Sequence, residues 1–245
     1  MNTELTDYHK DIIRESDHLI ADLDGTFVRG RISYSSFHLL KNMIEKGKGI
    51  DSLKGLAEGI RIYFKTPIVK RFCGEWEAEN WGLRALHRVL ENSEISEEEI
   101  RKSAKTYLEK RQIRGARYCF ENIRSFGKKK KTLLVTRALY PWSSEANRYL
   151  KFDEYISNVI KFKDNKVDEI QITMEKPEDK FRLIREKVRN TGNSVMITNN
   201  PEDLQLKPEL ALIISSPTSN GRLKEESHLH ISNYEEFNKA LSRKQ

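Results

Sequence analysis

The chain has 245 residues, enough for one domain with a buried core or for a core that carries an insertion. Charged residues make up 33% of it and the formal net charge is +7, which favours phosphate esters, nucleic acid or acidic membrane surfaces as ligands. Recurring apolar runs exclude a disordered chain, and none is long enough to cross a bilayer. The two cysteines lack metal-type spacing, so we expect reduced thiols in a soluble, cytoplasmic protein.

The most informative stretch is residues 19–27, which read Leu-Ile-Ala-Asp-Leu-Asp-Gly-Thr-Phe. Strand side chains alternate between faces, so Asp22 and Asp24 can enter one crevice just beyond a buried strand. Two carboxylates held close favour a cation between them or a proton on one of them, which predicts Mg²⁺ and acid–base chemistry. Gly25 allows a sharp turn, and Thr26 adds a hydroxyl. The alternative is an ordinary Asp-Gly turn, which does not account for the whole combination.

After this strand, residues 34–110 predict successive helices, since Phe37, Leu40 and Ile44 recur at helical spacing. Ser96, followed by three glutamates, predicts a helix start with acids at the positive end of the helix dipole.

Basic and aromatic residues alternate in the stretch 61–72 of this helical region. One interpretation is an amphipathic helix that buries Ile62, Phe64 and Phe72. Two others are a lid over an anionic substrate and a weak membrane-surface patch.

The second half of the chain alternates predicted strands and helices. Lys128–Lys131 is interpreted as a solvated turn, because no aromatic residues interleave for base stacking, and we expect no nucleic-acid binding. The alternation predicts a parallel sheet covered on both faces. Strands are expected at 132–136, 195–197, 210–214 and 229–231, a hairpin at 159–172 with its turn at Asp164-Asn165, and helices near 116–126, 142–149, 179–188 and 234–241.

Three further motifs follow the first in chain order. Thr136 is a hydroxyl residue at a predicted strand end, and either Lys176 or Lys180 lies near a helix start. We favour Lys180, because its helix runs directly to the next strand. The last motif reads Thr-Asn-Asn-Pro-Glu-Asp, from Thr198 to Asp203.

This ordered set resembles the haloacid dehalogenase superfamily of phosphohydrolases, especially its phosphoserine phosphatase-like branch with a helical cap. The resemblance implies an α/β fold, with a Rossmann-like parallel sheet core and an inserted all-helical cap. The core would be residues 1–32 and 112–245, and the cap residues 33–111.

The resemblance also implies a role for each motif residue. Asp22 would attack phosphorus to form an aspartyl-phosphate, and Asp24 would act as general acid and then general base. Thr136 would hold phosphoryl oxygens, and Lys180 would neutralise charge. Mg²⁺ would be bound by Asp22, the Asp24 carbonyl and an oxygen of the last motif.

The last motif departs from the family pattern, because Asn199 stands where an aspartate usually binds the metal. An uncharged amide predicts weaker metal affinity unless Asp203 contributes. Asp203 is interpreted as a metal-supporting residue, with helix capping as the alternative. An Asn-rich version of this motif also resembles the metal-free dehalogenases of the superfamily, but these lack the second carboxylate that Asp24 provides.

The loop after the nucleophile departs as well, because Arg29 and Arg31 stand where phosphoserine phosphatases place a glutamate for the serine ammonium. These arginines predict a second anionic group on the substrate and argue against phosphoserine. Their alternative is a pair of solvated loop arginines. Arg137, after Thr136, is a further substrate-binding candidate that touches the phosphate or blocks it.

The sequence therefore predicts a Mg²⁺-dependent phosphatase that hydrolyses a small phosphomonoester. The alternative is a catalytically weakened or non-catalytic protein of the same fold that binds a phosphorylated ligand or a protein partner. The substrate's identity and the oligomeric state are left open.

Overall fold

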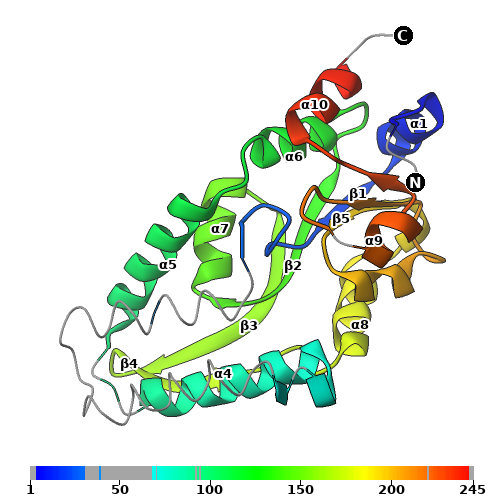
Figure 1. Cartoon of the computed structure of the whole chain (residues 1–245). Coiled ribbons are helices and arrows are strands. Elements are labelled where there is room, and N and C mark those ends of the chain that lie inside the picture. The colour runs from blue at the N-terminus through cyan, green and yellow to red at the C-terminus, as the bar shows by residue number, and fades with distance from the viewer. Residues whose placement is uncertain are drawn as a thin grey trace.

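A seven-stranded sheet crosses the centre of the molecule (Figure 1). The computed structural model describes residues 4–30, 39, 68–69, 71–91, 93, 95–219 and 221–242. The strand order is β4-β3-β2-β1-β5-β6-β7, and every neighbouring pair is parallel except β3 with β4. The predicted Rossmann-like parallel sheet is confirmed. Its strands are β1 (His18–Ala21), β2 (Lys131–Tyr140), β3 (Glu154–Lys163), β4 (Lys166–Gln171), β5 (Ser194–Thr198), β6 (Leu212–Ser215) and β7 (Leu229–His230).

Helices alternate with the strands along the chain, as expected. Ser96 caps α5, because its side chain accepts from the Glu99 amide while the Glu99 carboxylate accepts from the Ser96 amide. The first helix, α1, was not predicted. The helices are α1 (Asp7–Glu15), α4 (Glu75–Glu91), α5 (Glu97–Arg111), α6 (Ala116–Ser125), α7 (Trp142–Leu150), α8 (Pro177–Lys187), α9 (Gly221–Glu226) and α10 (Tyr234–Ser242), with short 3-10 turns η1 (Thr191–Asn193) and η2 (Pro201–Leu206).

Alternate residues of the strands enter two separate apolar clusters. Leu19 and Ala21 of β1 join the cluster that includes side chains of α1, α5, α6, α7 and α10. Ile20 points the other way and packs with Phe181 and Ile184 of α8. This two-faced burial explains why the strands read as continuous apolar runs.

Helix α4 packs against β4 and runs along the β3–β4 hairpin in Figure 1. The turn of the hairpin lies at Asp164 and Asn165, as predicted, and both residues have left-handed backbones, with φ of 50° and 62°. The other long helix, α5, packs against α7. Apolar side chains of both α4 and α5 enter the cluster that contains Leu19 and Ala21.

Two expectations about solvent exposure were wrong. Lys130 is not solvated: it is only 1% exposed, and its Nζ donates to the carbonyls of Phe126 at 2.8 Å and Lys128 at 3.0 Å. Phe72 is not buried but 79% exposed. Residues 61–67, and the positions Phe37, Leu40 and Ile44, lie outside the described residues.

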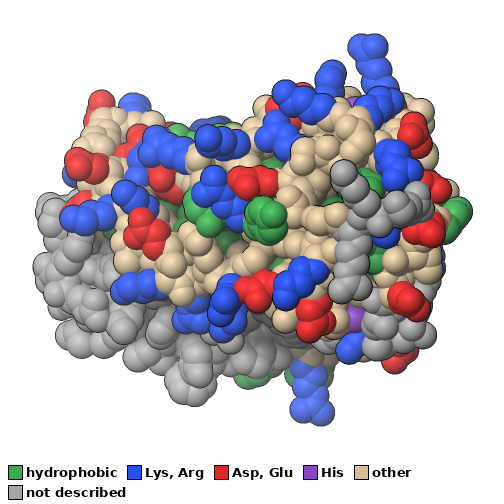
Figure 2. All heavy atoms as spheres, turned by 90° about the horizontal axis from the view of Figure 1, so that it is seen from above, with side chains coloured by type: hydrophobic (Ala, Val, Ile, Leu, Met, Phe, Trp, Pro, Cys, Tyr) green, Lys and Arg blue, Asp and Glu red, His purple; other side chains and the backbone are tan. Residues whose placement is uncertain are grey.

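The visible surface carries charges of both signs. Figure 2 shows many Lys and Arg side chains on one face with Asp and Glu among them, so this face is no uniform basic patch. Among the described residues, no helix is both long and apolar enough to span a membrane.

Candidate active site

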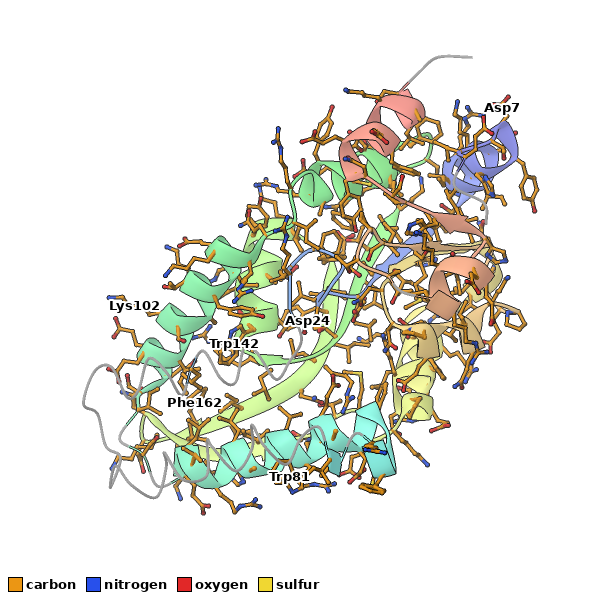
Figure 3. All side chains as sticks on the ribbon, viewed as in Figure 1. Asp7, Asp24, Trp81, Lys102, Trp142 and Phe162 are labelled. Atoms are coloured by element: carbon orange, nitrogen blue, oxygen red, sulfur yellow. The ribbon has the colours of Figure 1, made fainter. Side chains whose placement is uncertain are left out.

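The predicted site residues come together beyond the carboxyl end of β1. The Asp22 amide donates to the carbonyl of Ile197 in β5 at 3.1 Å, which continues the pairing of β1 with β5 past the strand end. A pocket of about 280 Å³ lies here, and Asp22, Asp24, Thr136, Lys180 and Asn199 all line it. Figure 3 labels Asp24 near the middle of the molecule.

The turn at Gly25 is held tightly between the first and last motifs. Gly25 has a φ of +76°, and its amide donates to the carbonyl of Val28 at 2.7 Å. A Cβ at this position would lie 1.8 Å from Nδ2 of Asn199. The Gly25 carbonyl accepts from the hydroxyls of Ser216, at 3.0 Å, and Thr218. A glycine is therefore required both for the backbone conformation and for the close approach of Asn199.

Lys180 is a buried cation that lines the pocket. Its Nζ lies 3.7 Å from Oδ1 of Asp22 and 2.8 Å from Oδ1 of Asp203. Asp203 is fully buried and also accepts from the Thr198 hydroxyl at 2.6 Å. Burial alone would lower the pKa of Lys180, but Asp203 and Asp22 raise it. The lysine is therefore held charged beside Asp22.

Burial raises the pKa of both carboxyls of the first motif. Burial raises the pKa of Asp22 to about 7, against the lowering effect of Lys180. Burial raises the pKa of Asp24 well above its ordinary value, and the charges of Asp22 and Glu79 raise it further. Both shifts favour the protonated carboxyl, and Lys180 opposes the shift at Asp22. The two carboxyls therefore have different electrostatic surroundings, which suits one to act as a nucleophile and the other as an acid.

Thr136 and Arg137 follow each other on β2, where its register with β3 shifts. The Thr136 hydroxyl accepts from the Ala138 amide at 3.0 Å. The Arg137 guanidinium donates to Oδ1 of Asn80 at 2.6 Å and to Glu79, and it lies 3.9 Å from the centre of the Trp76 ring. Arg137 therefore lines the pocket while its guanidinium contacts α4.

Four other predicted residues are not among those that line the pocket, and one of the four is not described by the structure. Arg29 is exposed, and its amide donates to the carbonyl of Arg111 at 2.6 Å. Arg31 lies outside the described residues. Lys176 is exposed at the N-cap of α8, so of the two candidate lysines only Lys180 enters the pocket. Asp203 lies behind Lys180.

The pocket residues suit a hard cation. Asp22, Asp24 and Asn199 supply oxygen donors, and Oδ2 of Asp24 is buried without a hydrogen-bond partner. Within the described ranges, no three His, Cys, Asp or Glu residues form a group that could hold a metal ion. Mg²⁺ is usually bound by one or two carboxylates together with water and substrate phosphate oxygens. These donors therefore fit a Mg²⁺ ion that is bound jointly with a phosphate.

Comparison of the structure with solved structures shows which fold this is. A substrate-bound phosphoserine phosphatase complex matches with a TM-score of 0.63 and 15% identity, over 89% of this chain and 94% of that one. A HAD family hydrolase from Salmonella enterica serovar Typhi matches with a TM-score of 0.65 and 15% identity, over 94% of this chain and 78% of that one. The chain has the haloacid dehalogenase fold, of the phosphoserine phosphatase-like kind.

A protein of unknown function from Bordetella pertussis Tohama I shares this haloacid dehalogenase fold, with a TM-score of 0.67 and 15% identity, over 88% of this chain and 98% of that one. No protein-family model matches the sequence, and the comparison with curated proteins found no match. At these identities the similarity establishes the fold alone.

Several residues that build this site were not found from the sequence. Trp76 and Glu79 of α4 and Glu202 of η2 line the pocket. Burial raises the pKa of Glu202. Glu202 belongs to the last motif of the haloacid dehalogenase pattern, so its position was a usable signal. Nothing local marks the α4 residues, which reach the pocket only because α4 packs on the β3–β4 hairpin.

Proposed function

We propose that this protein is a Mg²⁺-dependent phosphatase that hydrolyses a small phosphomonoester through a phosphorylated Asp22. The observation that carries the proposal is the pairing of Asp22 with the buried Lys180, in a pocket that the second carboxyl, Asp24, also lines. The fold supports it, because a phosphoserine phosphatase with the same architecture was solved with an analogue of a phospho-aspartyl intermediate. That structure has a TM-score of 0.61 and 15% identity to this chain.

In the first half-reaction, an Asp22 oxygen attacks phosphorus while Asp24 donates its proton to the leaving alcohol oxygen. Lys180 offsets the negative charge on Asp22 and on the phosphoryl group, and the Thr136 hydroxyl is placed to donate to a phosphoryl oxygen. In the second half-reaction, Asp24, now a carboxylate, takes a proton from the water that attacks the aspartyl-phosphate. Asp22 is then restored.

Asp22, the Asp24 carbonyl and Asn199 would hold Mg²⁺, with Asp203 supporting them through Lys180. When bound, the ion supplies positive charge against the phosphoryl oxygens. The residues of the chain orient the nucleophile and hold the proton on Asp24.

We further propose that residues 1–32 and 112–245 form the catalytic core and that residues 33–111 form a helical cap. Support comes from α4 and α5, the two long helices that the structure describes within residues 33–111. They contact β4 and α7 respectively, and α4 supplies Trp76 and Glu79 to the pocket.

The test is phosphate release from a panel of phosphate esters, with and without Mg²⁺. The wild-type protein should show metal-dependent turnover of at least one ester, and Asp22→Asn should abolish it. Asp168→Asn, an exposed aspartate of β4, is the matched control and should retain full activity.

Asp24→Asn should slow breakdown of the intermediate, so that mass spectrometry detects phosphate on Asp22. Absence of turnover across the panel would instead favour the non-catalytic alternative. That alternative is supported by Asn199, because an uncharged amide at this position predicts weaker Mg²⁺ binding than an aspartate would give.

A further inference from the structure

Arg137 is held at both its backbone and its side chain. Its carbonyl accepts from Nδ2 of Asn158 at 2.8 Å. Its guanidinium donates to Asn80, to Glu79 and, at 3.1 Å, to the carbonyl of Trp76. The side chains of Asn80, Arg137 and Asn158 are 1%, 6% and 0% exposed. A guanidinium buried among several acceptors makes strong, geometrically specific contacts.

Both asparagines also reach the segment 173–175. Oδ1 of Asn158 accepts from the amides of Thr173, at 2.9 Å, and Met174, at 3.3 Å. Nδ2 of Asn80 donates to the carbonyl of Glu175 at 2.6 Å. This segment leads directly into α8, the helix that carries Lys180.

The network therefore joins three parts of the site. Asn80 belongs to α4, which supplies the pocket wall of Trp76 and Glu79. Arg137 follows Thr136 on β2. The segment 173–175 comes just before α8, the helix that carries Lys180. The hydrogen bonds of the network therefore form a continuous path from α4 to the residue that follows Thr136 and to the start of the helix that carries Lys180.

We propose that Arg137 is a positioning residue that fixes α4 over the pocket and holds Thr136 and Lys180 in register with Asp22. This role deepens the proposed phosphatase function and rests on it. It differs from the substrate-binding role that the sequence predicts for Arg137. A residue that positions the site affects every substrate alike, whereas one that binds a second anionic group affects only substrates that carry such a group.

The first measurement needs no activity: hydrogen exchange of the α4 amides in the full-length protein. Arg137→Met should speed exchange in α4 at least tenfold, and Asn80→Ala at least threefold. Arg84→Met is the matched control, because Arg84 also lies on α4 and contacts Glu175, at 3.3 Å, but is half exposed. It should leave exchange unchanged. If Arg137→Met does not fold, Asn80→Ala decides the question.

The second measurement compares 4-nitrophenyl phosphate with 4-carboxyphenyl phosphate. Arg137→Met should lower kcat at least tenfold for both esters, with KM changing less than threefold, and Arg137→Lys should recover part of the loss. A rise in KM for the carboxylated ester alone, with α4 exchange unchanged, would overturn the proposal. If the wild-type protein turns over neither ester nor any other of the panel, the phosphatase function fails. The exchange experiment still tests the network.

Discussion

Lys180 Nζ lies 3.7 Å from the Asp22 carboxylate, and its shorter contacts, at 2.8 and 2.9 Å, are with Asp203. Asp203 therefore acts as an anchor for the lysine. Asp22, at the longer distance, lines the pocket in which the phosphoryl group of the proposed reaction would lie.

Lys180→Met should abolish turnover and also destabilise the fold. The substitution leaves Asp203 buried without its counter-ion, which typically costs about 3–5 kcal/mol of unfolding free energy. Urea denaturation measures this loss. Lys176→Met, at the exposed start of the same helix, should change the unfolding free energy by less than about 0.5 kcal/mol. Equal effects of the two substitutions would contradict the assignment of Lys180.

Gly25→Ala should cost more stability than Gly74→Ala, although both glycines have positive φ, of 76° and 90°. Among the described residues, apart from the chain neighbours of Gly74, no atom lies within 4 Å of a Cβ at this position, so only backbone strain of about 1 kcal/mol is expected there. At Gly25 the Asn199 amide must also move, which adds about 1–3 kcal/mol.

Thermal or urea unfolding of the two glycine variants compares these costs. Only Gly25→Ala should also reduce phosphatase activity. If the two substitutions lowered the unfolding free energy by the same amount, the contact between Asn199 and Gly25 would contribute no additional cost, and the prediction would be wrong.

Asn199→Asp should strengthen metal binding. A unit charge about 4 Å from a cation contributes on the order of 4 kcal/mol before desolvation is subtracted. We therefore expect the Mg²⁺ concentration for half-maximal activity to fall about tenfold. A titration of activity against Mg²⁺ measures this. An unchanged midpoint would show that residue 199 does not contact the ion.

Lys130 should make stability depend on pH above neutrality. Burial lowers the pKa of Lys130 to about 8, from 10.5. Between these values the unfolded chain holds a proton that the folded protein has released, so raising the pH through this window favours the folded state. The gain is at most about 3 kcal/mol.

Urea denaturation at pH 7.5 and 10.5 provides the measurement. The unfolding free energy of the wild type relative to Lys130→Met should increase by up to about 3 kcal/mol across that range. Lys129→Met, which alters an exposed neighbour, should show no such change relative to wild type. A difference that stays constant with pH would mean that Lys130 is ordinarily solvated.

Most residues found from the sequence follow a buried strand or begin a helix. Asp22 and Asn199 come just beyond β1 and β5. Thr136 was expected at the end of its strand, but β2 continues to Tyr140, and Thr136 lies inside it where the register with β3 shifts. Parallel strands bring their carboxyl ends to one edge, so chain order was sufficient to predict that these side chains meet.

The residues that were missed lie far along the chain from their partners. Asn80 and Arg137 are 57 residues apart. Asn158 lies within β3, and nothing in the neighbouring sequence indicates that its side chain accepts hydrogen bonds from the amides of Thr173 and Met174. Lys130 was misjudged for a different reason, because its partners are close in sequence. A run of lysines is typical of a solvated turn, but the chain folds back so that Lys130 donates to the carbonyls of Phe126 and Lys128.

The sequence by itself determined the alternation of strands and helices and the set of chemical groups at the strand ends, because both depend on local periodicity and on chain order. Only the tertiary structure decided which charges share a buried environment. It placed Asp203 behind Lys180 and α4 beside Arg137, and it raised the pKa values of Asp22 and Asp24. The reason is physical: desolvation and pairing depend on distances between segments that chain order does not specify.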